Sequence, residues 1–538
     1  MALQPTLTAG TWRASLDTPD GDPTSAPAGV FRSTNPASGA TLADSYPISP
    51  WREVETALLA AQGAVEALWT TPPDAIAAFL DAYAAAIETR ADALVDMAHL
   101  ETALPADPRL RSVELPRTTG QLRQAAAACR ERTWRRATID SKLNIRSKYA
   151  PLGGPVVIFG PNNFPFAFNA ISGGDFAAAV AAGNPVIAKA HPSHPGTTLL
   201  LAEAAFEALQ AARMPPATVQ MLYHLAPEDG LRLVAHPLIG ATAFTGSRTA
   251  GLRLKEAADR AGRPIYLEMS SLNPVFILPG ALAERSEAVA GELFGSCTLG
   301  VGQFCTKPGL AVLVDDANGA GFVEQTKHLF AAAPAGVLLS EQGPKTLAAA
   351  LGVLQGHGAK IVARGSEPMG AAGFRFAPVL LVVSGDAFLA QPDALQTEAF
   401  GPAALLVLAR DATQMVEIAA RLDGNLTGSI YSHSLGQDDG LYAQLEPVLR
   451  RKVGRLLNDK MPTGVAVTAA MNHGGPYPAT GHPGFTAVGI PAAMLRFAAL
   501  HSYDTIRHDR LPPELQNRNP TGRMWRLIDG EWTQGDVG

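Results

Sequence analysis

The sequence predicts an α/β fold built on parallel sheets, and three observations lead to this prediction. Short apolar runs such as 155–159 and 185–189 are typical of buried strands, and they alternate with stretches of helical apolar spacing. The connections are short, as in strand–helix–strand units with right-handed crossovers. The alternation starts again near residue 273, which predicts a second α/β domain. Ligands bind such sheets at the carboxyl ends of their strands, so polar residues at those ends are the first candidates for function.

The elements follow in order along the chain. Residues 1–50 are rich in Pro, Gly, Ser and Thr and predict strands and turns, whereas residues 51–136 carry apolar residues at i, i+3 and i+4 and predict helices. The first α/β series has predicted strands at 155–159, 185–189, 219–222, 241–244 and 264–268, and predicted helices ending at residue 182 and at 197–213, 228–236 and 249–261. The second series has predicted strands at 273–278, 311–314, 360–363, 378–383, 403–408 and 428–431. The polar tail after residue 504 predicts one last hairpin at 524–532.

Composition and charge exclude several classes of function. The chain has 538 residues, of which 47% are hydrophobic and 17% charged, as in ordinary globular proteins. A net charge of −6 without a basic run gives no footprint for nucleic acid. No stretch approaches the roughly 20 apolar residues of a membrane span, and residues 1–12 lack the pattern of a signal peptide. The three cysteines, at positions 129, 297 and 305, form no disulfide framework and no metal-ligand spacing, so we expect a reducing, cytoplasmic location and no metal.

Cys305 lies in the loop 300–309, which reads Gly-Val-Gly-Gln-Phe-Cys-Thr-Lys-Pro-Gly. Glycines remove side-chain bulk, so a substrate and backbone amides can approach the sulfur closely. A thiolate is a strong nucleophile once its pKa is lowered or a base lies near it. A buried structural cysteine is the alternative, and the loop alone does not decide between the two.

Polar residues follow several predicted strands. The turn 159–165 contains Asn163, whose amide could donate hydrogen bonds into a cleft, although asparagine is also a common turn residue. Lys189 suits ribose or phosphate oxygens, unless it only extends to solvent. Glu268 ends a strand beside apolar residues, where burial raises the pKa of a carboxyl group and suits a general base; a surface carboxylate is the alternative.

The segment 244–251 joins a predicted strand to a predicted helix and contains Gly246, Ser247 and Gly251. Ser247 is placed to cap the helix, and a helix N-terminus offers free N–H groups to a phosphate. A plain strand–helix turn is the alternative, because such turns are very common.

The segment 397–402 places Glu398 and Phe400 before a Gly-Pro turn. Glu398 could accept hydrogen bonds from a sugar diol, and Phe400 could pack on a ring. The alternative is a loop held by one anchoring aromatic residue.

Taken together, these segments resemble the aldehyde dehydrogenase superfamily, in the same order and over nearly the whole chain. The chain is most similar to an NADP-type branch that contains α-ketoglutaric semialdehyde (2,5-dioxovalerate) dehydrogenases and a fatty-aldehyde dehydrogenase. That likeness rests on 189–196, 268–274, 302–306 and 473–478. The last segment reads His-Gly-Gly-Pro-Tyr-Pro, where many relatives have a Phe-Gly-Gly turn followed by a lysine.

The resemblance implies a domain organisation. Residues 1–136 and 153–271 would form a Rossmann-like dinucleotide-binding domain, and residues 272–470 the catalytic domain. Residues 137–152 and 490–505 would form a small β oligomerisation arm, followed by a C-terminal tail at 506–538. Because a two-stranded arm is unstable alone, a homodimer or homotetramer is expected, and a monomer in gel filtration would contradict this.

The resemblance also implies the roles of the catalytic residues. Cys305 would attack the aldehyde carbon and form a thiohemiacetal, whose oxyanion Asn163 and the backbone N–H of Cys305 would hold. Hydride transfer to NAD(P) would leave a thioester, and Glu268 would then activate water to release the acid. Cys129 and Cys297 would be packed helix residues.

The remaining site residues serve the cofactor and the substrate by the same resemblance. Lys189 and Glu398 would bind ribose hydroxyls, Gly246, Ser247 and Gly251 would border the pyrophosphate, and Phe400 would pack near the nicotinamide. An apolar tunnel suited to an alkyl or aryl aldehyde would be lined by Phe164, Phe166, Phe168, Asn169, Phe304 and Thr306. A dicarboxylic semialdehyde would need a basic residue at the tunnel mouth, for which Arg123 is a candidate only by its place in the helical N-terminal region.

NADP is the expected cofactor, with NAD as the alternative. Relatives specific for NAD often carry a glutamate three positions after the strand-end lysine, and here Pro192 stands at that place, so no carboxylate repels a 2′-phosphate. The acidic Glu228 and Asp229 lie in a segment that often borders the adenosine pocket and weigh against NADP.

Three other functions remain as alternatives. A CoA-acylating semialdehyde dehydrogenase typically lacks a base at the position of Glu268. A cofactor-free cysteine esterase would not explain the cofactor-type segments, although a side esterase activity fits the same thiol. A structural relative without activity would lack the nucleophile or the base, and this chain has both.

Overall fold

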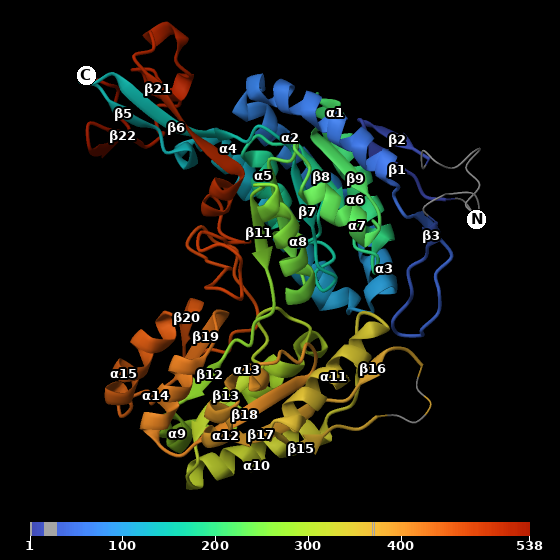
Figure 1. Cartoon of the computed structure of the whole chain (residues 1–538), viewed down its shortest axis with the longest axis vertical. Coiled ribbons are helices and arrows are strands. Elements are labelled where there is room, and N and C mark those ends of the chain that lie inside the picture. Colours follow the sequence, from blue (N-terminus) through green and yellow to red (C-terminus); the bar gives the residue numbers. More distant parts are fainter. Residues whose placement is uncertain (1–2, 15–28, 368–369, 371) are drawn as a thin grey trace.

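The computed structural model describes residues 3–14, 29–367, 370 and 372–538. Two α/β units and a projecting arm make up the molecule (Figure 1). The first unit is built around a sheet whose strands lie within residues 6–268, and the second around a sheet within residues 275–458. The arm is a third sheet, formed by strands within residues 138–151 and 498–533. In the described residues, no helix is long and apolar enough to cross a membrane.

The sheet of the first unit has seven strands in the order β11-β10-β7-β8-β9-β1-β2. Their bounds are β1 (Thr6–Thr8), β2 (Thr11–Arg13), β7 (Val156–Phe159), β8 (Val186–Lys189), β9 (Val219–Leu222), β10 (Ala241–Thr245) and β11 (Ile265–Glu268). Strands β7 to β11 are parallel, and β1 pairs antiparallel with β9. The five parallel strands confirm the first predicted series, and their carboxyl ends point toward the second unit (Figure 1).

Helices cover both faces of this sheet because its parallel strands are apolar on both sides. Val156 and Ile158 pack with α2 to α6, while Val157 between them packs with α1 and α7. The helices are α1 (Trp51–Thr70), α2 (Pro73–Thr89), α3 (Ala91–Thr102), α4 (Leu115–Glu131), α5 (Gly174–Ala181), α6 (Pro195–Ala211), α7 (Pro227–Val234) and α8 (Arg248–Arg260), with short turns η2 (Ala106–Glu114), η3 (Thr133–Arg135) and η4 (Pro216–Thr218). These helices confirm the predicted helical stretch from residue 51.

The segment before α5 differs from the predicted helix. Residues 164–172 form turns, and α5 begins only at Gly174. Asn169 Nδ2 donates to the Pro165 carbonyl at 2.9 Å, and Ser172 Oγ donates to the Phe166 carbonyl at 2.7 Å. Such local bonds from Asn and Ser side chains compete with the helical pattern.

The sheet of the second unit has the order β15-β17-β18-β13-β12-β19-β20. Its strands are β12 (Val275–Ile277), β13 (Leu310–Val314), β15 (Lys360–Arg364), β17 (Val379–Ser384), β18 (Ala403–Ala409), β19 (Asn425–Tyr431) and β20 (Val453–Asn458). All six predicted strands are present, but β15 pairs antiparallel with β17, and the edge strand β20 was not predicted. The alternating series did not reveal β20 because half-buried polar residues interrupt its apolar run.

Two layers of helices enclose this second sheet. Helices α9 (Pro279–Thr298) and α10 (Ala317–Ala332) cover one face. The other face packs against α11 (Gln342–Gly356), α12 (Gly385–Ala390), α13 (Pro392–Leu395), α14 (Ala412–Arg421) and α15 (Asp439–Arg450). The short pieces β14 (Gly336–Val337), β16 (Arg375–Phe376) and η5 (Leu299–Gly302) complete this unit. The pieces β3 (Val30–Phe31), β4 (Tyr46–Pro47) and η6 (Ala492–Phe497) pack on the core of the first unit.

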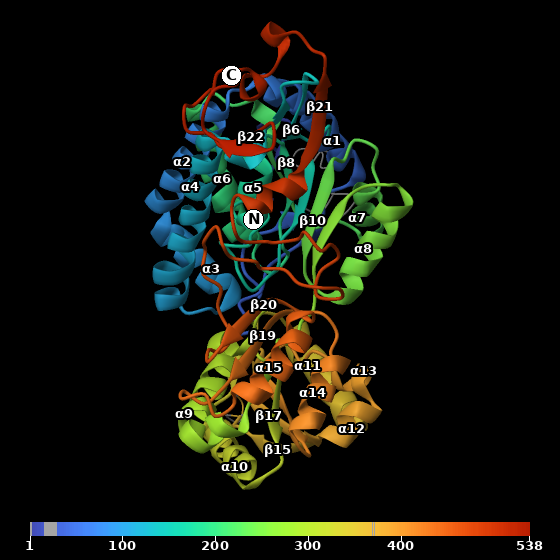
Figure 2. The same cartoon turned by 90° about the vertical axis from the view of Figure 1, so that its left-hand side faces the viewer.

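The arm is larger than the two-stranded element that was expected. Its order is β21-β6-β5-β22-β23, with β5 (Thr138–Asp140), β6 (Ile145–Pro151), β21 (Ala498–Asp504), β22 (Arg526–Ile528) and β23 (Glu531–Thr533). Strands β22 and β23 confirm the predicted last hairpin. Turns η7 (His508–Arg510) and η8 (Pro513–Leu515) lead into it. Figure 2 shows the arm beside the first unit and away from the second.

The fully buried Arg526 explains why the polar tail folds onto the arm. Its guanidinium donates to the carbonyls of Gln516 at 2.6 Å, Asn517 at 3.0 Å and Gly535 at 2.8 Å. One side chain thus satisfies three backbone acceptors of a segment that has little regular structure.

Lys307 connects the loop that carries Cys305 to the segment 399–403. Its buried ammonium group donates to the Ala399 carbonyl at 3.0 Å and to the Ala403 carbonyl at 2.7 Å. From the other side, Asn273 Nδ2 donates to the carbonyls of Cys305 and Lys307, both at 2.9 Å. The loop that carries Cys305 is therefore fixed to the strand ends of the second unit.

We expect Lys307→Met to lower the thermal unfolding midpoint, because it leaves two buried carbonyls without donors at a cost of about 2–4 kcal/mol. Differential scanning fluorimetry measures the change. Lys345→Met is the matched control, since Lys345 is exposed and pairs only with Glu341 on α11, a contact worth less than about 1 kcal/mol. Equal midpoints for the two variants would contradict the structural role of Lys307.

Candidate active site

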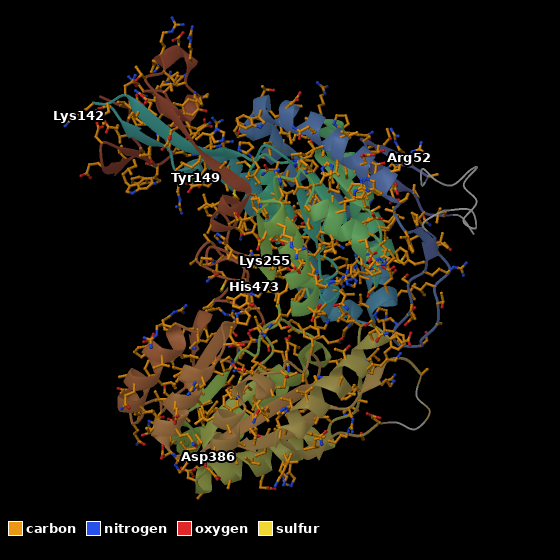
Figure 3. All side chains as sticks on the ribbon, viewed as in Figure 1. Arg52, Lys142, Tyr149, Lys255, Asp386 and His473 are labelled. Carbon is orange, nitrogen blue, oxygen red and sulfur yellow. The ribbon has the colours of Figure 1, made fainter. Side chains whose placement is uncertain are left out.

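A cavity of about 300 Å³ lies where the strand ends of the first unit meet loops of the second. It is lined by Pro161, Asn162, Asn163, Thr245, Gly246, Ser247, Glu268, Met269, Ser270, Cys305, Thr346, Glu398 and Phe400. Residues predicted from five separate stretches of sequence are thus in contact with one space. Figure 3 labels His473 at the same junction between the two units.

Cys305 reaches this cavity from a tight glycine loop after η5. Gly300 and Gly302 have positive φ angles of 57° and 67°, and a Cβ on Gly302 would lie 2.1 Å from the Gly401 carbonyl oxygen. Glycine is therefore required at position 302, both for the positive φ angle and because a Cβ would collide with the Gly401 carbonyl oxygen. The close approach of residues 302 and 401 brings the Cys305 loop against the loop that carries Glu398.

The Cys305 thiol is electrostatically disfavoured as a thiolate. Burial raises its pKa well above the usual value, the negative charge of Glu268 raises it further, and the charge of Arg117 acts in the opposite direction. At neutral pH the free thiol is therefore protonated, and a nucleophile at this place needs a proton acceptor nearby.

His473 supplies a nitrogen between the thiol and the carboxylate. Its Nε2 lies 3.4 Å from Cys305 Sγ and 3.0 Å from Glu268 Oε1. The ring is buried, and its backbone is held by hydrogen bonds with Thr486 and Ala487, both at 2.9 Å. Both contacts are made by the same nitrogen, so a proton that passes from the thiol to Nε2 can then be shared with Glu268 Oε1.

The contacts of His473 were not predicted from the sequence. The sequence did single out the segment 473–478 as a departure from many relatives, but it assigned no role to the histidine. A histidine where a phenylalanine is usual was the available signal. Its meaning depends on spatial contacts with residues 168 and 205 positions away.

A metal ion is the other group that such a cluster can hold. The ligand atoms of Glu268, Cys305 and His473 all lie within 4.8 Å of one another. Sulfur, imidazole nitrogen and carboxylate oxygen are also the ligands of zinc. The sequence predicted no metal, and this cluster is the place where that expectation can be tested.

Asn163 faces the same cavity beside Cys305. Its Nδ2 donates one hydrogen bond to the Gln303 carbonyl at 2.9 Å, and a second N–H remains on that nitrogen. The backbone carbonyl of Asn163 accepts a hydrogen bond from Arg109 Nη2 at 3.0 Å. The turn is thus held firmly by its neighbours.

The predicted cofactor residues divide into two groups. Gly246, Ser247, Glu398 and Phe400 line the cavity, and Ser247 caps α8 by accepting a hydrogen bond from the Ala250 N–H. Gly251 does not line the cavity. It packs closely against Met269 and Phe244, and a Cβ at this position would come within 3.2 Å of their atoms.

Lys189 lies at the carboxyl end of β8, outside the residues that line the cavity. Burial lowers the pKa of its ammonium group to about 8. Charges on Lys189 and the buried His194 in turn lower the pKa of the neighbouring His191, after burial itself. This end of the sheet is therefore rich in basic groups.

Three aromatic residues of the predicted tunnel, Phe164, Phe168 and Phe304, form one cluster, whereas Phe166 packs in the core of the first unit. Phe164 lies edge-on to Phe168 and Phe304, with ring centroids 5.2 and 5.3 Å apart. Asn169 and Thr306 lie near this cluster, but their side chains are hydrogen-bonded within the protein. Asn169 Nδ2 donates to Thr198 at 3.0 Å, and Thr306 Oγ1 accepts from the Gly464 N–H at 3.2 Å.

Two other predictions concern the remaining cysteines and Arg123. Cys129 in α4 and Cys297 in α9 are fully packed, and burial raises the pKa of each thiol to about 12, which confirms them as packed helix residues. Arg123 is half exposed and pairs with Glu88 at 2.6 and 2.7 Å.

Comparisons with known proteins identify the family of the chain. A model of the aldehyde dehydrogenase family matches residues 24–447. α-Ketoglutaric semialdehyde dehydrogenase 2 of Azospirillum brasilense is 40% identical over 522 residues, which cover 94% of this chain and 96% of that protein. α-Ketoglutaric semialdehyde dehydrogenase of Acinetobacter baylyi is 36% identical over 493 residues, with coverage of 90% and 92%.

Solved structures share the fold at lower identity. PnpE in complex with nicotinamide adenine dinucleotide has a TM-score of 0.77 at 20% identity and covers 94% of this chain and 97% of its own. 1-Pyrroline-5-carboxylate dehydrogenase of Thermus thermophilus has a TM-score of 0.76 at 23% identity, with coverage of 93% and 92%. The match along most of the sequence shows that this chain belongs to the aldehyde dehydrogenase family and is an oxidoreductase that acts on aldehydes.

Proposed function

We propose that this protein oxidises an aldehyde to the carboxylic acid with NAD(P), through a thioester on Cys305. The observation that carries the proposal is the single cavity in which Cys305, Glu268 and Asn163 lie with the N-terminus of α8. Acid formation needs a nucleophile, an oxyanion donor and a base, and these residues offer one of each.

The first step activates the thiol. The Cys305 S–H proton passes to His473 Nε2 across 3.4 Å, and the resulting imidazolium is stabilised by Glu268 at 3.0 Å. The sulfur attacks the aldehyde carbon and forms a thiohemiacetal. The free N–H of Asn163 and the backbone N–H of Cys305 hold the developing oxyanion.

The second step forms and cleaves the thioester. A bound nicotinamide cofactor supplies the acceptor for the hydride that leaves the thiohemiacetal carbon. Glu268 then accepts a proton from water, which adds to the thioester carbon. When the acid departs, the sulfur recovers its proton from His473, and Glu268 releases to solvent the proton that it took from water before the next turnover.

The residues present fit a dinucleotide. Lys189 is a buried ammonium group for which the described residues offer no hydrogen-bond partner, so ligand oxygens complete its surroundings. The capped N-terminus of α8 faces the cavity and suits a pyrophosphate, and Glu398 suits a ribose diol. Phe400 lines the opposite side of the same space.

NADP is the cofactor that we propose the enzyme prefers. Lys189 supplies a positive charge at this place and Pro192 no carboxylate, while burial lowers the pKa of His191, His194 and His224 and keeps these rings uncharged at neutral pH. Glu228 is exposed at the start of α7. A kcat/KM higher for NAD than for NADP with one aldehyde would contradict this preference.

A carboxylated aldehyde is the substrate class that the relatives support. The Azospirillum and Acinetobacter relatives are both named for α-ketoglutaric semialdehyde, which carries a carboxylate. We therefore propose a semialdehyde in place of the alkyl or aryl aldehyde that the aromatic tunnel alone had suggested.

Two alternative activities, transfer of the acyl group to CoA and hydrolysis of esters, differ in the reactants that they need. The presence of Glu268 in the cavity argues against CoA as the acyl acceptor, because this base activates water to attack the thioester. Side hydrolysis of activated esters is supported by the thiol–imidazole–carboxylate chain, and it would need no cofactor.

We also propose that the arm joins two or more copies. Its edge strand β21 carries the exposed Leu500, and Trp532 of the other edge strand β23 is also exposed. An open sheet edge with apolar residues favours pairing with another chain. A monomer mass in light scattering would contradict this assembly.

We also propose a reducing, cytoplasmic location, because the Cys305 thiol must remain reduced.

Cys305→Ser and Glu268→Gln separate the two steps. We expect Cys305→Ser to lower kcat by on the order of 10³-fold or more, because an alcohol at this place is far harder to ionise. Glu268→Gln should form close to one reduced cofactor per site in a rapid burst and then stall, because the thioester forms but is not hydrolysed.

Stopped-flow absorbance of the reduced nicotinamide measures both effects. Glu256→Gln, on the exposed face of α8, is the control and should keep steady turnover. Full turnover by Cys305→Ser would refute the thioester route.

His473→Phe tests the proton acceptor through its pH profile. Because the pKa of the Cys305 thiol is raised, the thiol stays protonated at neutral pH and gains reactivity only as the pH increases. We expect kcat/KM at pH 7 to fall about 10²-fold and to rise steadily as the pH increases above neutrality, because the raised pKa of the thiol delays its ionisation.

The rate of Cys305 alkylation by iodoacetamide should shift with pH in the same direction. His328→Phe, at an exposed position of α10, is the control and should leave both profiles unchanged. A uniform loss at every pH would argue that His473 only packs against Phe168.

A further inference from the structure

Arg117 is a buried guanidinium on the first turn of α4 that faces the aromatic cluster of the tunnel. Its Cζ lies 5.1 Å from the Phe168 ring centroid and 5.6 Å from that of Phe164. Its Nε and Nη2 are buried, and no acceptor among the described residues is within hydrogen-bond distance of them. A buried charge without such partners is costly unless a ligand completes its surroundings.

The nearest carboxylate is already used by other donors. Glu114 forms an ion pair with Arg109, and its Oε1 accepts hydrogen bonds from the amides of Phe166 at 2.8 Å and Ala167 at 3.0 Å. Arg109 is thereby neutralised and stacks on Phe164 at 4.4 Å. Arg117 feels the charges of Glu114 and Glu268, but among the described residues no carboxylate forms an ion pair with it.

Arg117 lies close enough to the reacting thiol for their charges to interact. Burial lowers the pKa of Arg117 most, and the charge of Cys305 is the strongest influence in the opposite direction. Phe168 links the two places, since its ring centroid lies 5.6 Å from that of His473, whose Nε2 contacts Cys305. The Phe168 ring is thus in contact with both the His473 ring and the guanidinium.

A second arginine borders the same thiol and holds the tunnel wall. Arg455 on β20 donates to the carbonyls of Pro462 at 2.6 Å and Gly464 at 3.0 Å. Its charge also interacts with that of Cys305. Two guanidinium groups, those of Arg117 and Arg455, thus lie within electrostatic range of the thiol, which favours an anionic substrate.

Resting on the proposed oxidation at Cys305, we propose that Arg117 binds the distal carboxylate of the substrate and selects semialdehydes of dicarboxylic acids over neutral aldehydes. The planar guanidinium forms charge-assisted, two-point hydrogen bonds with a carboxylate. Arg117 is thus a specificity-determining residue, and the surface residue Arg123 on the same helix is not.

The test compares glutaric semialdehyde with pentanal, which has the same chain length without the carboxylate. We expect Arg117→Gln to lower kcat/KM for glutaric semialdehyde about 10- to 100-fold and to change that for pentanal by less than about 3-fold. Arg117→Lys should restore part of the difference, because it keeps the charge but lacks the planar fork. Arg123→Gln is the matched control on α4 and should change neither value.

A binding measurement keeps this inference separate from the oxidation itself. Glutarate should raise the thermal midpoint of the wild-type protein and of Arg123→Gln, but not that of Arg117→Gln. Equal losses on both aldehydes, or glutarate stabilisation that survives in Arg117→Gln, would overturn the role of Arg117. Absence of all aldehyde turnover with normal glutarate stabilisation would instead refute the proposed oxidation and leave the carboxylate site standing.

Discussion

The contact of His473 with both Cys305 and Glu268 is the constraint on which the site depends. Glu268 ends the last parallel strand of the first unit, while Cys305 lies in a loop fixed to the second. The segment 473–480 bridges them, because Glu268 and Thr480 pair as an isolated β-bridge and the Met269 N–H donates to the Ala479 carbonyl. Any movement between the two units therefore alters the distances within the catalytic chain.

Burial explains why that contact is needed. A thiol enclosed by apolar rings loses the hydration that would stabilise its thiolate, and the adjacent Glu268 adds repulsion. The same burial keeps bulk water away from a hydride path and from the thioester until Glu268 activates one molecule. A site that excludes water thus disfavours ionisation of its own thiol. The imidazole of His473, in direct contact with the sulfur, offsets this effect by accepting the proton.

The sequence predicted the parts of this structure that depend on local pattern. Apolar runs located every parallel strand of the first unit, and glycines marked the loop of Cys305, since residue 302 cannot carry a side chain against Gly401. It did not predict β20 or the size of the arm, because both depend on pairing between distant segments. Arg117 was missed for the same reason: it lies six residues before Arg123 on one helix, and only packing decides which of them meets Glu88 and which meets Phe168.

Arg117 and His473 are coupled through the charge of the substrate. In the free protein the Arg117 charge lowers the pKa of the Cys305 thiol and opposes the effects of burial and Glu268. A substrate carboxylate bound to Arg117 would neutralise that charge and remove its help at the moment when the thiol must ionise. The proton must then be taken by a group in direct contact, because a distant charge that is screened no longer contributes. An anionic substrate therefore increases the dependence of thiol ionisation on His473.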